Sequence, residues 1–391
     1  MKNNFDEIIE RKNTDSLKYD FAVRRGKPEG ILPLWVADMD FKSPSCVIDA
    51  LIEKSRHGIF GYSNTREDYF NALRHWFSEQ FSWNVKPEWL VKTPGVVYAI
   101  CTAIRALTEE GDAVLIQQPV YYPFSGSVIA NRRKLVVNQL VYSQGKYTID
   151  FTDFEEKIIK NKVKLFILCS PHNPVGRVWS REELVRIGDL CLKHGVLVVS
   201  DEIHADFTFP GHRHLVFADL KQEFSDITIT CTAPTKTFNL AGLQISNIFI
   251  SNQNIRRRFK KEIAASGYSD PNIMGIVACR AAYSGGREWL SELREYLLDN
   301  LNYLRDFLKQ RLPQIKLVEP EGTYLVWLDF SALNLDDKKL EDFIENQAGL
   351  WLNSGTTFGA GGEGFQRINI ACPRSTLEKA LIQLEQAINR L

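Results

Sequence analysis

Residues 164–201 read KLFILCSPHNPVGRVWSREELVRIGDLCLKHGVLVVSD. Two short apolar runs, KLFILC and VLVVS, flank a segment at 181–194 in which we expect a helix. Each run is apolar at nearly every position, which is typical of strands that are buried on both faces of a parallel sheet. The stretch therefore predicts a strand–helix–strand unit whose sheet is covered by helices.

The same alternation extends over residues 90–250 and then changes. Further strands are expected at Ala113–Gln117, Lys134–Gln139, Thr228–Cys231 and Asn247–Ile250, and further helices at Val97–Leu107 and Phe151–Lys160. A helix-rich stretch at 256–312 precedes a strand–helix–strand–helix pattern, which indicates a smaller α+β unit. We therefore expect an α/β fold with a large, doubly wound, mainly parallel sheet. The predicted division is an N-terminal segment (1–45) associated with the small domain, a large domain (46–285) and a C-terminal small domain (286–391).

The composition excludes several classes of protein. Lys+Arg and Asp+Glu both count 48, so no net charge attracts nucleic acid or an anionic membrane. No segment approaches 18 apolar residues and the N-terminal sequence has no apolar core, so we expect neither a membrane span nor a signal peptide. The seven cysteines are an odd number and form no CxxC pair. We therefore expect no disulfide framework and a cytoplasmic location.

Polar residues follow the predicted strands at the edge where α/β sheets bind ligands. Asn173 follows KLFILC in a turn bracketed by prolines and a glycine. Asp201 follows VLVVS directly, and burying a carboxylate there is costly unless it meets a cation or a protonated ring. Each residue alone has an ordinary alternative, a turn residue for Asn173 and a helix cap for Asp201.

A lysine completes this set. Residues 230–242 read TCTAPTKTFNLAG and place Lys236 between threonines after a predicted strand. A lysine there suits an amine that forms a Schiff base with a carbonyl compound, and a solvated loop lysine is the ordinary alternative. An amide, a carboxylate and an amine on neighbouring strand ends can together hold a pyridine aldehyde.

SPHNPVGRVW, VSDEIHADF and TKTFNLAGLQ resemble the fold-type I enzymes that use pyridoxal 5′-phosphate (PLP). Within them the chain resembles the MalY/PatB branch of carbon–sulfur β-lyases, the cystathionine β-lyases. LPLWVADMDF, TPGVVYAI, GTYLVWLDF and RINIACPRSTLEKAL extend this resemblance over nearly the whole chain. The resemblance implies α,β-elimination of a sulfur amino acid. Cystathionine would give homocysteine and cysteine would give hydrogen sulfide, in each case with pyruvate and ammonia.

The resemblance also implies roles for single residues. Lys236 would form the Schiff base and remove the Cα proton, and Asp201 would pair with the pyridine nitrogen. Asn173 would donate to the ring oxygen. His204 stands where related aminotransferases have a tyrosine that contacts the same oxygen, and Tyr121 matches the ring that stacks on the pyridine face.

A further set is expected at the cofactor phosphate. TPGVVYAI lies at a predicted helix start, where backbone N–H groups bind phosphate. By resemblance Gly95, Val96 and Val97 cradle the phosphate and Thr235 adds a hydroxyl. Tyr62 matches a tyrosine that reaches the phosphate from a second subunit, which implies a homodimer with a shared active site.

The substrate carboxylate requires a bidentate guanidinium. By resemblance Arg367 takes this role, with the backbone around Ala37 and the amide of Asn173 beside it. Arg374 is a second candidate, for which a surface role is favoured.

Two positions depart from the family pattern. Ala233 stands where serine is common, and Gln244 stands where aminotransferases commonly have arginine. Phosphate binding would then depend on the backbone and on Thr235 or Thr232.

Two other motifs are rejected. GAGGEG at 359–364 fits GxGxxG, but it precedes a strand and opens no helix, so a loop is expected. His204, His212 and His214 with Asp201 match no zinc spacing, and we expect no metal.

Two rival functions stay open. An aminotransferase of the same fold begins its reaction identically, and residue types do not separate the two. A non-enzymatic regulatory protein that keeps the PLP fold would be expected to have lost Lys236 or Asp201, and both are present.

Overall fold

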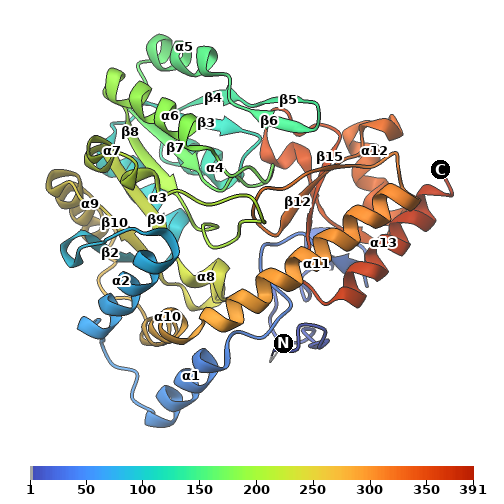
Figure 1. Cartoon of the computed structure of the whole chain (residues 1–391), viewed down its shortest axis with the longest axis horizontal. Helices are drawn as coiled ribbons and strands as arrows, with labels where there is room; N and C mark the ends of the chain where they lie inside the picture. The colour runs from blue at the N-terminus through green and yellow to red at the C-terminus, as the bar shows by residue number, and fades with distance from the viewer. Residues whose placement is uncertain (1–2) are drawn as a thin grey trace.

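The computed structural model describes residues 3–391 and has a seven-stranded sheet at its centre (Figure 1). Its strands lie in the order β2 (Leu90–Thr93), β10 (Ser246–Phe249), β9 (Thr228–Thr232), β8 (Leu197–Asp201), β7 (Leu165–Cys169), β3 (Ala113–Gln118) and β4 (Lys134–Gln139). Strand β10 is antiparallel to both of its neighbours, and the other neighbouring strands are parallel. The predicted α/β class and the mainly parallel sheet are confirmed.

Helices cover both faces of this sheet because its strands are apolar on both sides. Val114 and Ile116 of β3 pack in one cluster with residues of α3 (Val96–Leu107) and α9 (Gln253–Ala265). Leu115, between them, packs in another cluster with residues of α5 (Phe151–Asn161), α6 (Arg181–His194) and α7 (Gln222–Ile227). Successive side chains of a strand point to opposite faces, so a strand between two helical layers is apolar throughout.

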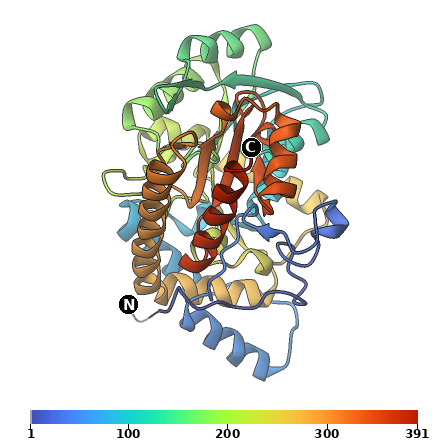
Figure 2. The same ribbon diagram turned by 90° about the vertical axis from the view of Figure 1, so that its right-hand side faces the viewer.

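A second, antiparallel sheet follows the long helix α11 (Arg287–Arg311). Its strands lie in the order β11 (Lys316–Val318), β12 (Leu325–Asp329), β15 (Phe365–Asn369) and β14 (Asn353–Ser354). Helices α11 and α13 (Arg374–Ile388) lie side by side along it (Figure 2). The N-terminal segment joins this region, because β1 (Leu32–Pro33) pairs in parallel with β13 (Leu350–Trp351). The domain division at residues 45 and 285 stays a proposal.

Several further helices and one hairpin belong to the fold, and the apolar periodicity of residues 44–58 and 68–81 predicts the first two of these helices. These elements are α1 (Ser45–His57), α2 (Glu67–Phe81), α4 (Pro123–Ala130), α8 (Pro234–Thr237), α10 (Ile273–Gly285), α12 (Asp337–Asp342) and the hairpin of β5 (Val141–Ser143) with β6 (Lys146–Thr148). Strand β2, helix α4 and the hairpin were missed. Lys236 lies in the short helix α8 rather than in a loop, and Asp201 is the last residue of β8 rather than the residue after it.

Residues 359–364 form a loop before β15, as predicted. Gly359 has φ of 95°, and a Cβ atom there would lie 2.2 Å from the side chain of Gln118. The loop therefore requires glycine at this position. All seven cysteines lie within residues 3–391 and are free thiols there. Among residues 3–391, no helix is long and apolar enough to cross a membrane.

Gly188 generates a stability prediction. It lies in α6, and a Cβ atom there would lie 2.2 Å from the Phe224 ring. We expect Gly188→Ala to lower the free energy of unfolding by about 1–3 kcal/mol, because the ring must move in a packed core. The matched control is Gly126→Ala in α4, where an added Cβ meets no atom within 4 Å. Denaturant unfolding measures both variants, and equal stability of the two would contradict the described packing.

Candidate active site

A cavity at the carboxyl ends of β7 and β8 brings most of the predicted site residues together. Its lining residues come from the large sheet, the small sheet and the N-terminal segment: Trp35, Val36, Ala37, Val96, Val97, Tyr121, Tyr122, Cys169, Asn173, Asp201, Ile203, His204, Lys236, Asn353 and Arg367. The predicted members of this set are Ala37, Val96, Val97, Tyr121, Asn173, Asp201, His204, Lys236 and Arg367.

Asp201 supplies a buried carboxyl group at the end of β8. It is 5% exposed, and its Oδ1 accepts a hydrogen bond from the Ile203 N–H at 3.1 Å. Burial raises the pKa of Asp201 to about 7, and the neighbouring Glu202 acts in the same direction. A carboxylate in this environment is stabilised by a cationic partner, because burial disfavours its charged form.

Lys236 supplies an amine to the same cavity. Helix α8 begins at Pro234, whose ring has the fixed φ that suits a first helical position. The Lys236 Nζ donates to the backbone carbonyl of Ala37 at 2.9 Å. Burial lowers the pKa of Lys236 to about 8, while the charge of Asp38 opposes this shift. A substantial fraction of the amine is therefore neutral, and hence nucleophilic and basic, near neutral pH.

Arg367 is a buried cation on β15 that meets only neutral oxygens. It is 3% exposed and donates to Asn173 Oδ1 at 2.8 Å, to the Trp35 carbonyl at 2.7 Å and to Asn353 Oδ1 at 2.5 Å. Among residues 3–391, its Nε atom has no hydrogen-bond partner. Burial lowers the pKa of Arg367 to about 10. A buried guanidinium without a carboxylate partner is an energetic cost that an anionic ligand would offset.

His204 and Tyr121 lie on the walls between these charged groups. His204 is 4% exposed, and its Nδ1 has no hydrogen-bond partner in the part of the chain that the structure describes. Burial lowers the pKa of His204 to about 3, and Lys236 and Arg367 act in the same direction, so the ring is neutral. The Tyr121 N–H donates to the Asn173 carbonyl at 3.0 Å, which joins the two loops after β3 and β7.

The start of α3 forms one end of the cavity. Gly95 is the residue before the helix, and Val96 and Val97, its first two residues, line the cavity. A Cβ atom on Gly95 would meet no atom within 4 Å, so the space beside it is open. Free N–H groups at a helix start bind anions. Thr235 is buried in α8 and does not line the cavity.

The family departures lie nearby. Ala233 precedes α8 and is buried, whereas Gln244 is exposed at the end of a short turn. Thr232 Oγ1 already donates to the Asn247 carbonyl at 2.7 Å, so its hydroxyl hydrogen is committed within the sheet.

Some predicted residues lie outside the cavity. Tyr62 lies between α1 and α2 with its side chain fully exposed. Arg374 donates to Asn300 Oδ1 at 2.8 Å and lies over the Tyr303 ring, which places it in the packing of α11 against α13. Among residues 3–391, no group of three or more His, Cys, Asp or Glu side chains could hold a metal ion.

Other lining residues were not predicted. Trp35 stacks on Trp351 with ring centroids 4.4 Å apart, and its place in the apolar run LPLWVADMDF could have suggested a buried wall. Tyr122 adjoins Tyr121 in QPVYYPF, and no sequence pattern would have predicted that its side chain also lines the cavity. Asn353 lies in a polar loop-like stretch that carries no motif, so only the pairing of β14 with β15 reveals it.

Comparison with known proteins agrees with this geometry. The model of the family "Aminotransferase class I and II" matches residues 29–384. Cystathionine beta-lyase PatB of Bacillus subtilis (strain 168) is 44% identical over 99% of this chain and 100% of that protein. Protein MalY of Escherichia coli (strain K12) is 35% identical over 98% of both chains.

Two solved structures share the fold. A PLP-bound protein of Clostridium difficile 630, provisionally described as an aminotransferase, is 43% identical with a TM-score of 0.97 over 99% of this chain and 100% of its own. Cystalysin of Treponema denticola, whose structure contains PLP, is 39% identical with a TM-score of 0.96 over 100% of both chains.

The large sheet and the cavity at its strand ends define a fold-type I α/β protein. The chain belongs to the class I and II aminotransferase family. Within that family the predicted resemblance to the MalY/PatB branch is confirmed.

The environment of Lys236 generates a titration prediction. Because burial lowers its pKa to about 8, the neutral amine should dominate above that pH in protein freed of any aldehyde. Competitive acylation followed by peptide mass spectrometry measures the titration midpoint of this one amine. A midpoint near the ordinary lysine value of 10.5 would contradict the described burial.

Proposed function

We propose that this chain is a PLP-dependent carbon–sulfur β-lyase, which cleaves thioethers such as cystathionine to a thiol, pyruvate and ammonia. One observation carries the proposal. Asp201, Lys236 and Arg367 face a single cavity, and within residues 3–391 the hydrogen-bond partners of their side chains are neutral backbone and amide groups. The 44% identity to PatB over the full length supports the choice of a β-lyase within the family.

The cavity residues fit the cofactor. Lys236 would hold the aldehyde carbon through its amine, and Asp201 would hold the ring nitrogen. When protonated, that nitrogen would be the cationic partner that stabilises the buried Asp201 carboxylate. Asn173 and His204 would contact the ring oxygen, and the Nδ1 of His204 has no partner among residues 3–391. Tyr121 would stack on the ring face.

The phosphate would lie at the start of α3. Gly95, Val96 and Val97 would present backbone N–H groups at the positive end of the helix dipole. The open space beside Gly95 fits this role. Thr235 would add a hydroxyl, and neither Ala233 nor Gln244 would contribute a side-chain contact.

The substrate carboxylate would bind Arg367, with Ala37 and Asn173 beside it. The guanidinium is held in place by the carbonyl of Trp35 and the amides of Asn173 and Asn353, while its Nε is free to donate. The substrate carboxylate would supply the negative charge that this buried guanidinium does not receive from its neutral neighbours.

PLP, when bound, supplies an electron sink that stabilises negative charge at the substrate Cα. The chain's own residues do the rest. Lys236, whose pKa burial lowers to about 8, takes the Cα proton as a general base. Asp201 would keep the ring nitrogen protonated, and the apolar walls of Val96, Val97 and Trp35 limit the access of water. The thiolate would then leave Cβ with the electron pair of the C–S bond and take up a proton, and the 2-aminoacrylate released from the site would be hydrolysed by water to pyruvate and ammonia.

The assembly and location are further parts of the proposal. Tyr62 of a second copy would reach the phosphate, which makes the enzyme a homodimer with a shared site. Its full exposure in one chain supports this role, because an exposed tyrosine is free to enter another subunit. A cytoplasmic location stays a prediction.

Assay with L-cystathionine tests the reaction. We expect pyruvate and a free thiol to form in the absence of any keto acid, and Lys236→Ala to lose nearly all of this activity because its base is removed. An exposed lysine provides the control, since Lys338→Ala should retain the full rate. Product that appears only when a keto acid is added would instead establish the aminotransferase, for which the description of the C. difficile protein gives a reason.

The role of Arg367 gives a second prediction. Arg367→Lys keeps the charge but loses the planar, bidentate donor set, so we expect KM to rise about tenfold or more. Arg374→Lys is the matched control, because Arg374 is committed to Asn300 and Tyr303 outside the cavity. If the two variants have the same KM, Arg367 does not bind the substrate.

A further inference from the structure

The N-terminal segment sends two backbone carbonyls into the cavity. The Trp35 carbonyl accepts from Arg367 at 2.7 Å, and the Ala37 carbonyl accepts from Lys236 at 2.9 Å. The carbonyls between and beside them point the other way, because those of Val36 and Asp38 accept from Asn369 Nδ2 at 2.8 and 2.7 Å. The segment thus places one acceptor on each of the two cationic groups of the site.

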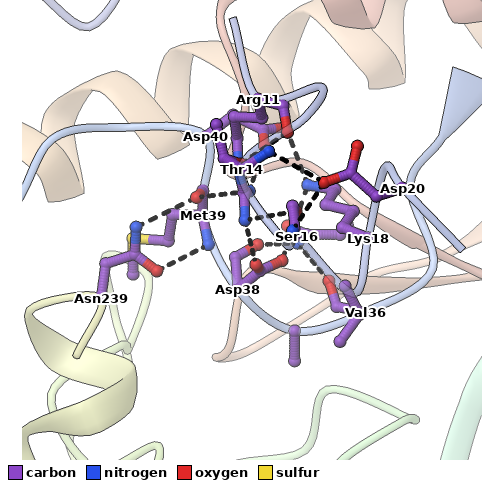
Figure 3. A network of polar contacts seen from close by, with 12 residues as sticks. Arg11, Thr14, Ser16, Lys18, Asp20, Val36, Asp38, Met39, Asp40 and Asn239 are labelled. Atoms are coloured by element: carbon purple, nitrogen blue, oxygen red, sulfur yellow. Dashed lines mark hydrogen bonds and ion pairs between the residues drawn. The ribbon is translucent and has the colours of Figure 1, made fainter. Parts of the chain in front are cut away.

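The Ala37 carbonyl has a second donor. Tyr324 Oη donates to it at 2.9 Å, and this tyrosine is fully buried beside His204. The main chain beyond Ala37 is also fixed, since Asn239 accepts from the Met39 N–H and donates to the Met39 carbonyl, both at 3.0 Å. Asn239 is three residues from Lys236, so these bonds join the segment to the turn that directly follows helix α8, which carries the amine (Figure 3).

Two cations from earlier in the chain, Arg11 and Lys18, form ion pairs with two carboxylates of this segment, Asp38 and Asp40 (Figure 3). We name these four side chains the ion cluster. Lys18 Nζ lies 2.8 Å from Asp40 and 3.9 Å from Asp38. Arg11 bridges the same two carboxylates at 2.7 and 2.6 Å. The cluster contains two cations and two anions, so its charges balance.

The burial of Lys18 distinguishes the cluster from a surface network. Its side chain is 0% exposed and that of Asp40 is 6% exposed. A buried ion pair contributes little net stability, but it fixes geometry because each charge requires its partner. A turn presents the two cations, since Asp20 accepts from the backbone N–H groups of Asn13, Thr14 and Ser16. The position of the cluster is therefore set by local backbone.

We propose that the ion cluster is a latch that positions the Trp35 and Ala37 carbonyls, so that Lys18, Arg11 and Asp40 are positioning residues for Arg367 and Lys236. This inference rests on the proposed function only in so far as that function makes Arg367 the substrate-binding residue and Lys236 the base. Without the latch the segment would move away from the site, and both cations would lose an oriented acceptor. The amine of Lys236 would then lose a fixed position whenever it is not bonded to an aldehyde.

Lys18→Met tests the latch in the full chain. It removes the charge and keeps much of the volume, and Lys27→Met is the matched control. Lys27 lies on the same N-terminal segment and also pairs with two carboxylates, but these belong to Glu341 and Glu345, outside the Trp35–Asp40 stretch. We expect amide hydrogen exchange at Met39 and Asp40 to become about tenfold faster in Lys18→Met and to stay unchanged in Lys27→Met.

Kinetic constants, with kcat expressed per molecule of bound cofactor, distinguish a positioning role of Lys18 from an effect on protein stability alone. We expect Lys18→Met to raise KM about fivefold or more and to lower kcat, because Arg367 and Lys236 are both displaced. A variant that is only less stable would have fewer active molecules, with unchanged KM and unchanged kcat per cofactor bound. Unchanged constants or unchanged exchange at Met39 and Asp40 would overturn the proposal.

A second variant keeps the test decisive if Lys18→Met unfolds. Arg11→Gln removes the less buried cation, whose side chain is 21% exposed, and leaves the Lys18–Asp40 pair intact. We expect faster exchange at Met39 and a raised KM, each smaller than for Lys18→Met, and wild-type values would again overturn the latch. If faster exchange occurs in a protein that lacks lyase activity even as wild type, the latch stands and the proposed function fails.

Discussion

The structure depends on three ionisable groups that the fold buries around one cavity without pairing them to one another. Asp201, Lys236 and Arg367 each bring a charge into a region where burial opposes it, as their shifted pKa values indicate. Such an arrangement costs stability in the empty protein. A ligand that carries a cationic ring nitrogen and an aldehyde, together with a substrate that carries a carboxylate, would satisfy all three groups.

The topology explains how these groups meet. Parallel strands end at the same edge of a sheet, so residues after β7 and at the end of β8 become neighbours although they are far apart in the sequence. The small sheet brings Arg367, whose donation to Asn173 at 2.8 Å connects the two sheets. The N-terminal segment completes the cavity with two carbonyls, which makes it part of the site rather than a tail.

Much of the fold and of the site could be predicted from the sequence, for identifiable physical reasons. Strand β7 is apolar throughout and β3 is apolar over residues 113–116 because both of their faces are covered, and that pattern is visible in the sequence. Asn173, Asp201 and Lys236 stand out because polar residues directly follow such runs. Helix α4 and strand β2 were missed because they are short and have no distinct periodicity.

Other features depend on three-dimensional contacts that local patterns do not contain. Nothing in the sequence around Lys18 indicates that its side chain is buried against Asp40, 22 positions away. Tyr324 reads as a strand residue, and only the fold places its hydroxyl on the Ala37 carbonyl. Tyr62 is the opposite case, since its predicted role requires a second chain and a single chain leaves it exposed.

The most direct test of the account is the site of covalent attachment. The protein is incubated with PLP, treated with borohydride to make the bond between cofactor and amine permanent, and digested for peptide mass spectrometry. The account predicts an absorbance band near the visible edge that borohydride discharges, with the label on Lys236. A protein that stays colourless, or a label spread over exposed lysines with none on Lys236, would contradict it.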